Sequence, residues 1–105
     1  MYRSMLYLNV KEGKAEALID WYKQVDSLGQ AVALAGCVST EIYPLPDEPN
    51  RLLVTALWRD EGDYQGWVDH PFRKKLTGGI NEFLDDTFNE GSKGLLLTSI
   101  LSAPN

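Results

Sequence analysis

The segment from residue 52 to residue 58 constrains the fold most strongly, because a single predicted strand there carries apolar side chains on both faces. One face holds Leu52, Val54, Ala56 and Trp58, and the other holds Leu53, Thr55 and Leu57. A strand of this kind needs cover on both sides. The rest of the chain offers helices for only one side. The pattern therefore predicts a homodimer through the open sheet face, in which a second subunit's sheet supplies the missing cover.

The strand leads directly into a helix with clear start and stop signals. Asp60 is placed to cap this helix, and the acidic residues that follow it suit the positive end of the helix dipole. Tyr64, Trp67 and Val68 then fall on one helix face. His70 precedes a proline, which disfavours helical structure at His70. The segment from Trp58 to residue 71 is therefore predicted to contain the end of a strand and a capped helix that stops before the proline.

A further helix is expected to begin at Pro71, since proline suits the first helical turn. Its apolar side is predicted to continue past residue 80 and to consist of Phe72, Leu76, Ile80, Phe83 and Leu84. The pair Gly78-Gly79 is a weak point in this helix. A turn between Gly91 and Gly94 and a last strand over residues 95–101 complete the chain.

The first half of the chain predicts two strands around two helices. Residues 2–10 alternate as a strand, and residues 14–25 carry apolar side chains at helical spacing. Ser27 and Gln30 have capping-box spacing, so a second helix is expected to start there and to end at Gly36. Its buried side would consist of Leu28, Val32 and Ala35. The second strand is expected from Cys37 to Tyr43.

Three prolines between residues 44 and 50 predict a turn without regular structure before the strand at residue 52. The element order is therefore β-α-β-β-α-β. This order predicts an α+β, ferredoxin-like fold with a four-stranded antiparallel sheet. The length of 105 residues is typical of one domain, so residues 1–105 are expected to form a single unit.

Composition excludes several classes of function. The net charge of −5 would repel nucleic acid. One cysteine, Cys37, and one histidine cannot supply a Cys/His zinc site, and no metal or other cofactor is predicted. Cys37 is expected to be a small apolar residue within a strand. No signal peptide or membrane-spanning stretch is expected, so the interpretation is a cytoplasmic protein without a membrane partner.

The chain resembles the antibiotic biosynthesis monooxygenase domains of the dimeric α/β-barrel group. The resemblance covers most of residues 4–101 and depends on three short sequence segments. These are the Lys/Gly turn within residues 9–14, the strand that follows Gly36, and the stretch with Trp58, Tyr64, Trp67 and His70-Pro71. The resemblance implies a homodimer and a ligand pocket between sheet and helices.

Two kinds of family member imply different site residues. In members that oxidise aromatic phenols to quinones without a metal or flavin, Trp58 and Tyr64 match a tryptophan and a tyrosine linked to substrate. The asparagine of those members falls on Val54. Their arginine lacks a counterpart, since Arg73 to Lys75 come earlier on the helix. In haem-degrading members, Trp67 matches a helix tryptophan, while the asparagine and histidine positions fall on Leu6 and Thr77. No iron ligand is therefore expected.

The candidate catalytic residues are His70, Tyr64 and Trp58, and the candidate substrate-binding residues are Leu6, Val54, Trp58, Tyr64 and Trp67. His70 is the side chain best suited to act as a general base near neutral pH. It could instead cap a helix or lie in an exposed turn. The aromatic residues could equally be core residues. The cluster Arg73-Lys74-Lys75 is interpreted as a solvated helix face, and the alternative is a role in binding an anionic ligand.

Three functions fit these observations. The first is a cofactor-independent monooxygenase acting on a small aromatic or quinol-type molecule in an apolar pocket. The second is a non-catalytic homodimer that binds a small apolar or aromatic ligand. The third is a structural homodimer whose cavity is filled by its own side chains.

Overall fold

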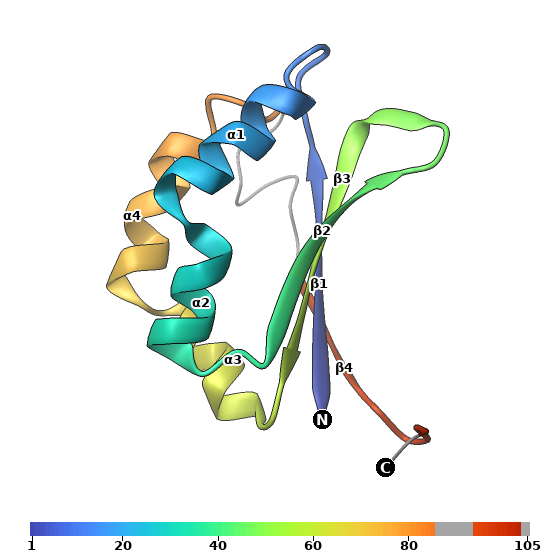
Figure 1. Ribbon diagram of the computed structural model, residues 1–105, viewed down its shortest axis with the longest axis vertical. Coiled ribbons are helices and arrows are strands. Elements are labelled where there is room, and N and C mark those ends of the chain that lie inside the picture. Colours follow the sequence, from blue (N-terminus) through green and yellow to red (C-terminus); the bar gives the residue numbers. More distant parts are fainter. Residues whose placement is uncertain (86–93, 104–105) are drawn as a thin grey trace.

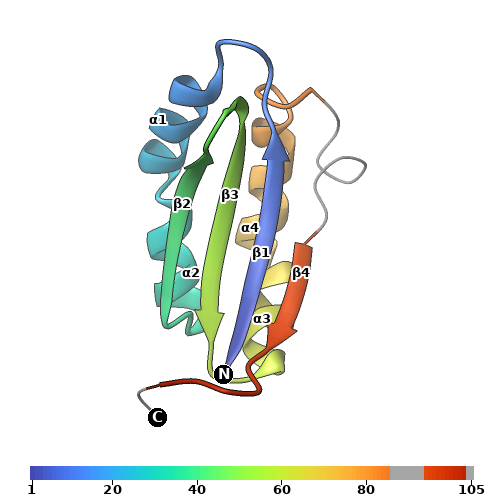
Figure 2. The same cartoon turned by 90° about the vertical axis from the view of Figure 1, so that its right-hand side faces the viewer.

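The computed structural model describes residues 1–85 and 94–103. Within this part of the chain, the elements in order are β1 (Tyr2–Asn9), α1 (Ala15–Val25), α2 (Ser27–Ala35), β2 (Ser39–Leu45), β3 (Glu48–Trp58), α3 (Glu61–Val68), α4 (Pro71–Ile80) and β4 (Gly94–Thr98). The strands form one antiparallel sheet, seen edge-on in Figure 1, and their order across it is β2-β3-β1-β4 (Figure 2). The predicted α+β, ferredoxin-like fold is confirmed.

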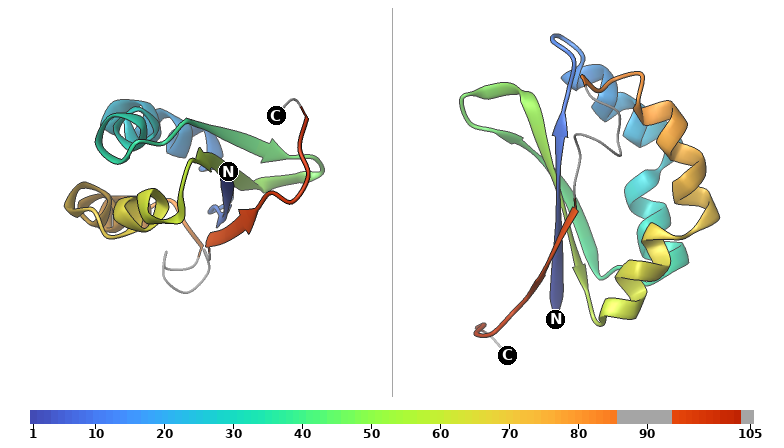
Figure 3. Two further views of the ribbon diagram at one scale, coloured as in Figure 1. Left: turned by 90° about the horizontal axis from the view of Figure 1, so that it is seen from below. Right: turned by 180° about the vertical axis from the view of Figure 1, so that it is seen from behind.

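The protein has two layers, and the helices cover only one face of the sheet. Seen from below in Figure 3, α1 and α2 form one row of helices and α3 and α4 form a second row beside it. Figure 2 shows the opposite sheet face with no helix in front of it. No helix among the described residues is long and apolar enough to cross a membrane.

Buried apolar side chains form two separate clusters beneath the helices. The first cluster consists of Leu8, Val10, Leu18, Tyr22, Leu52, Ile80 and Leu84. The second cluster consists of Ala31, Cys37, Ala56, Trp58 and Trp67. On β3, Leu52, Ala56 and Trp58, which were expected to share one face, are all buried in these clusters. Cys37 is buried as well, but it lies just before β2 rather than within a strand.

The start of α2 differs from the expected capping box. Asp26, not Ser27, is the N-cap residue, and it adopts a left-handed conformation with φ 53°. The left-handed conformation of Asp26 ends α1 and changes the direction of the chain, so that α2 starts along a different axis. As a result Ala31 is buried, whereas Val32, which was expected inside, is 45% exposed. The end of α2 at Gly36 agrees with the sequence, and Gly36 has φ 71°.

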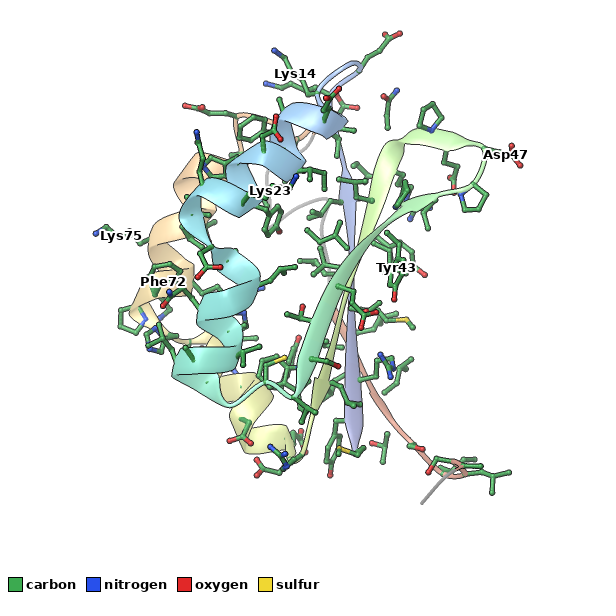
Figure 4. The ribbon with its side chains drawn as sticks, viewed as in Figure 1. Lys14, Lys23, Tyr43, Asp47, Phe72 and Lys75 are labelled. Atoms are coloured by element: carbon green, nitrogen blue, oxygen red, sulfur yellow. The ribbon has the colours of Figure 1, made fainter. Side chains whose placement is uncertain are left out.

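The prediction of an irregular segment over residues 44–50 is wrong. β2 includes Pro44 and β3 includes Pro49, so the strands form a long hairpin whose tip lies at Asp47 (Figure 4). Proline is tolerated in this position because β2 is an edge strand, where an amide N–H can be absent without a lost bond inside the sheet. Pro49 precedes the part of β3 that pairs with β1, which begins at Arg51.

The second half of the chain also has shorter elements than expected. α4 ends at Ile80, and Leu84 lies beyond it in a turn, yet Leu84 is buried and forms an isolated bridge with Val10. β4 ends at Thr98, and Ile100, which was assigned to the strand, is 97% exposed. Of the expected turn from Gly91 to Gly94, residues 91–93 lie outside the described residues.

The pair Gly78-Gly79 provides a matched test of the packing between α1 and α4. A Cβ added at Gly78 would meet no atom within 4 Å, whereas one added at Gly79 would lie 2.9 Å from Cζ2 of Trp21. Gly78→Ala should therefore raise the free energy of unfolding by about 0.5–1 kcal/mol, because alanine favours helix. Gly79→Ala should lower it, because the indole must move. Urea unfolding measures both values, and equal stability of the two variants would contradict this packing.

Candidate functional site

A cavity lies between the helices and the sheet, and residues of both core clusters line it. Its volume, counted as space open to the centre of a water molecule, is about 90 Å³. By that measure one water needs roughly 10–15 Å³, so the space can hold several waters or a small organic molecule. Most of the lining is apolar. All five candidate substrate-binding residues belong to it, namely Leu6, Val54, Trp58, Tyr64 and Trp67.

Trp58 forms a wall of the cavity at the end of β3. It is 1% exposed, and its Nε1–H donates a hydrogen bond to Oγ of Ser4 on β1 at 3.0 Å. Its ring meets Tyr64 edge-on, with ring centroids 5.8 Å apart. Because its polar atom is already bonded within the protein, Trp58 offers a ligand an aromatic surface rather than a hydrogen bond.

Tyr64 and Trp67 reach the cavity from α3, whose start is fixed by Asp60. The Asp60 carboxylate accepts a hydrogen bond from the Asp63 N–H at 2.9 Å, which confirms the expected cap. The Tyr64 hydroxyl extends toward β4, since a Cβ at Gly94 would lie 2.9 Å from that oxygen. Only glycine, which has no Cβ, leaves space for this close approach. Tyr64 therefore spans the space between α3 and the edge of the sheet.

Leu6 and Val54 form the floor of the cavity on neighbouring strands. They are direct partners in the antiparallel register of β1 and β3. Both side chains are on the helix-covered face and line the cavity. The floor is therefore hydrocarbon at these two positions.

His70 lies apart from the other candidates and does not line the cavity among the described residues. It is the N-cap of α4, where its Nδ1 accepts a hydrogen bond from the Phe72 N–H at 3.0 Å. Its ring also packs near Trp67, with centroids 6.0 Å apart. The structure thus brings Trp58 and Tyr64 together and places His70 at a helix junction, the alternative that the His-Pro pair also allowed.

Arg73 is the cavity residue that sequence reasoning placed wrongly. It was grouped with Lys74 and Lys75 as a solvated face, but it is half-buried and lines the cavity, while the two lysines are exposed. In Figure 4 Lys75 points away from the sheet. The available signal was helical spacing, because Arg73 shares a face with Leu76, Thr77 and Ile80, and all of them line the cavity.

Tyr22 on α1 was expected only as part of an apolar stripe, yet its ring lines the same cavity. Burial raises the pKa of its hydroxyl to about 12, and the positive charge of Arg73 acts in the opposite direction. Burial also lowers the pKa of Arg73 from its ordinary value, while Tyr64, Tyr22 and Asp69 counteract that effect. Tyrosines from two different helices are therefore close enough to Arg73 to affect its pKa when they are ionised.

The described residues contain no group of three or more His, Cys, Asp or Glu side chains that could hold a metal ion. Among the described lining residues there is also no carboxylate and no imidazole. Their polar side-chain groups are hydroxyls, indole N–H groups and one guanidinium. Such a site can bind and orient an electron-rich molecule and can stabilise negative charge.

Comparison with known proteins supports the same fold and family. The family model described as "Antibiotic biosynthesis monooxygenase" matches residues 1–76. A search of curated proteins gives no significant match.

Solved structures of similar shape cover nearly the whole chain. A Nitrosomonas europaea protein assigned as an antibiotic biosynthesis monooxygenase has 17% identity and a TM-score of 0.77, covering 96% of this chain and 100% of its own. Rv0793 from Mycobacterium tuberculosis has 15% identity and a TM-score of 0.76, with 97% of each chain covered. A variant of SnoaB, a cofactor-independent oxygenase from Streptomyces nogalater, has 14% identity and a TM-score of 0.73, covering 99% of this chain and 97% of its own. At these identities the likeness concerns the fold.

The buried hydroxyl of Tyr22 predicts a loss of stability in alkali. Its pKa is near 10 in the unfolded chain and about 12 in the folded protein, so above pH 10 the unfolded state releases its proton first. Stability from this group is complete below pH 10 and falls by roughly 2–3 kcal/mol as the pH rises to 12. Urea unfolding of the wild type and of Tyr22→Phe at pH 9 to 12 isolates this effect. Parallel pH profiles of the two proteins would refute it.

Proposed function

The chain belongs to the antibiotic biosynthesis monooxygenase family, and on this basis we propose that it is a cofactor-independent monooxygenase for a small aromatic, quinol-type molecule. The observation that carries the proposal is the cavity beside Trp58, which has aromatic walls and is hydrocarbon at Leu6 and Val54 on its floor. SnoaB, which shares the fold, is described as a cofactor-independent oxygenase, and this supports the proposal. The proposed binding residues are Leu6, Val54, Trp58, Tyr64 and Trp67.

The cavity suits a flat aromatic substrate. Trp58 and Tyr64 already form an edge-to-face pair, and Trp67 extends the aromatic surface along α3. A planar ring can pack against such walls with favourable stacking geometry. The apolar floor of Leu6 and Val54 keeps water away from the reacting carbon, so a reactive intermediate is protected from side reactions.

Without a cofactor, the substrate must supply every electron that oxygen receives. For a phenol that carries an activated methylene group, the balance is CH₂ + O₂ → C=O + H₂O. Loss of a proton to solvent gives the anion, which donates an electron to O₂ and then forms a C–O bond as a peroxide. The peroxide takes up a proton, loses water and leaves the carbonyl. The two C–H bonds supply the four electrons needed.

Oxygen uptake by metal-free protein tests this proposal. With a panel of hydroquinones and anthrones, the wild type should consume O₂ above the buffer rate. Trp58→Phe, which keeps a buried ring but loses the Ser4 hydrogen bond, and Tyr64→Phe should each lower the rate at least about tenfold, equivalent to about 1.4 kcal/mol. Lys75→Gln, on the exposed side of α4, should match the wild type.

The monooxygenase proposal would be wrong if the protein consumed oxygen no faster than buffer alone with every compound of the panel. Wild-type rates in both Trp58→Phe and Tyr64→Phe would instead remove the assigned roles of these residues. Circular dichroism of each variant separates a lost role from a lost fold.

A non-catalytic ligand-binding protein is the second candidate. It is favoured by the absence of a carboxylate or imidazole among the described lining residues, since such groups usually act as general bases. Binding of an aromatic ligand without oxygen uptake would support this alternative. The third candidate, a structural protein with a self-filled cavity, is disfavoured by the space beside Trp58.

We also propose that the protein is a homodimer through the open sheet face. Tyr43, Leu95 and Leu97 lie on that face and are 45%, 51% and 46% exposed. Figure 4 shows Tyr43 on the side of the sheet that the helices leave uncovered. A second sheet packed against this face would remove the apolar surface from water.

The dimer proposal has a matched pair of test variants. Leu97 on the open face and Val32 on α2 are 46% and 45% exposed, so a charge at either place meets similar solvent. Sedimentation velocity at micromolar concentration should show a dimer for the wild type and for Val32→Glu, but a monomer for Leu97→Glu. A monomeric wild type, or an unchanged dimer in Leu97→Glu, would contradict the proposed interface.

A further inference from the structure

We propose that Ser4 on β1 and Thr40 on β2 are specificity-determining residues that fix which way round a ligand lies in the cavity. Ser4 donates a hydrogen bond to an acceptor oxygen of the ligand, and Thr40 accepts one from a ligand hydroxyl. The ligand class is an aromatic ring with a carbonyl on one side and a hydroxyl on the opposite side. This inference deepens the proposed function and rests on it, because it names the residues that select and orient the substrate.

Ser4 and Thr40 lie on the sheet floor of the cavity, one on each side of Ala56. In the register of the sheet, Ala56 of β3 is paired with both Ser4 and Thr40, and β3 lies between β1 and β2 in Figure 2. All three residues line the cavity. Neighbouring strands are about 4.8 Å apart, so the backbones at Ser4 and Thr40 are separated by roughly 9–10 Å. Two hydroxyls therefore flank the floor next to its hydrocarbon part at Leu6 and Val54.

The Ser4 hydroxyl already accepts a hydrogen bond from the protein. Its Oγ accepts from the Nε1–H of Trp58 at 3.0 Å. No acceptor for the Ser4 proton is found among residues 1–85 and 94–103. A hydroxyl has one proton to donate, and a donor turned away from water without a partner costs free energy. A ligand that places an acceptor oxygen beside Ser4 removes this cost.

The Thr40 hydroxyl has the opposite character. Its Oγ1 donates its single proton to the carbonyl oxygen of Thr55 at 2.8 Å. Only lone pairs of Oγ1 are then left for the cavity, so Thr40 acts toward a ligand as an acceptor. The two hydroxyls thus differ because of the partners that the fold gives them.

This difference favours one orientation of the ligand. A reversed ligand would set its carbonyl oxygen against the lone pairs of Thr40, where no proton lies between the two oxygens. Its hydroxyl would then compete with Trp58 for the lone pairs of Ser4. Such mismatched polar contacts reduce affinity, and selectivity arises from that loss as much as from the matched contacts.

A ring with a carbonyl and a hydroxyl in para positions matches the spacing of the two residues. Its oxygens are slightly closer together than the two strand backbones, so each reaches its partner through one hydrogen bond of about 2.8 Å. The ring then lies over the methyl group of Ala56, with the edge-to-face pair of Trp58 and Tyr64 beside it.

Three probes of similar shape test the proposal at pH 6, where the phenols are neutral. 4-Hydroxyacetophenone carries both polar groups, 4-methylacetophenone only the carbonyl, and 4-isopropenylphenol only the hydroxyl. Dissociation constants come from heteronuclear NMR titration of isotope-labelled protein. The same spectra show whether each variant is folded, and the indole N–H signal of Trp58 reports on its bond to Ser4.

Ser4→Ala should weaken binding of both ketones at least about fivefold and change binding of 4-isopropenylphenol by less than about twofold. Thr40→Val should weaken both phenols by a similar factor and spare 4-methylacetophenone. Ser4→Thr, which keeps a hydroxyl, should restore ketone binding. Thr98→Val is the matched control, because Thr98 is an exposed strand residue that does not line the cavity, and it should match the wild type with every probe.

A merely structural role of Ser4 would weaken all three probes alike, so a uniform loss in Ser4→Ala would overturn the proposal. Unchanged ketone binding in Ser4→Ala, unchanged phenol binding in Thr40→Val, or no binding of any probe to the wild type would overturn it too. If Ser4→Ala does not fold, Ser4→Cys makes the same test, because a thiol is a much weaker donor.

Failure of this proposal is distinguishable from failure of the monooxygenase. Selective losses in the two variants without oxygen uptake by the wild type would exclude the oxygenase and leave the two specificity residues. Oxygen uptake without these selective losses would do the reverse.

Discussion

The burial of Trp58 is the contact on which the cavity depends. Its indole closes the end of β3, bonds to Ser4 on the neighbouring strand and packs edge-on against Tyr64 of α3. One side chain thus ties two strands and a helix at a single point. If this ring were smaller, α3 could settle closer to the sheet and the cavity would shrink. The Trp58 side chain therefore both forms a wall of the cavity and holds β1, β3 and α3 together.

The cavity persists because the core is divided into two clusters rather than packed as one. Aromatic residues packed in both clusters line the cavity, among them Trp21 and Tyr22 in the first and Trp58 and Tyr64 in the second. Close approaches at Gly79 and Gly94 let Trp21 and Tyr64 occupy positions that a Cβ would exclude. The sheet floor stays smooth because Leu6 and Val54 face each other across β1 and β3.

Much of the fold could be predicted from local signals. The alternation of β1 and β3, the cap at Asp60 and the proline at Pro71 each act within a few residues, and each was found where expected. The failures involve tertiary context. Pro44 was tolerated because β2 became an edge strand, and Pro49 because it precedes the part of β3 that pairs with β1, and no local pattern specifies either arrangement. The face of α2 turned because Asp26 adopted a left-handed conformation.

The candidate site shows the same difference between residues that local signals identify and residues whose position depends on tertiary context. Trp58 and Tyr64 could be recognised because they lie in a sequence segment that resembles the family, whereas His70 was assigned from the general chemistry of imidazole and Arg73 from the lysines beside it. His70 resembled an isolated base, although its ring nitrogen caps a helix. Arg73 stood among lysines, and its role depends on the helix face it shares with Leu76 and Ile80. Sequence neighbours on a helix diverge by about 100° per residue, so a run of like charges need not share one environment.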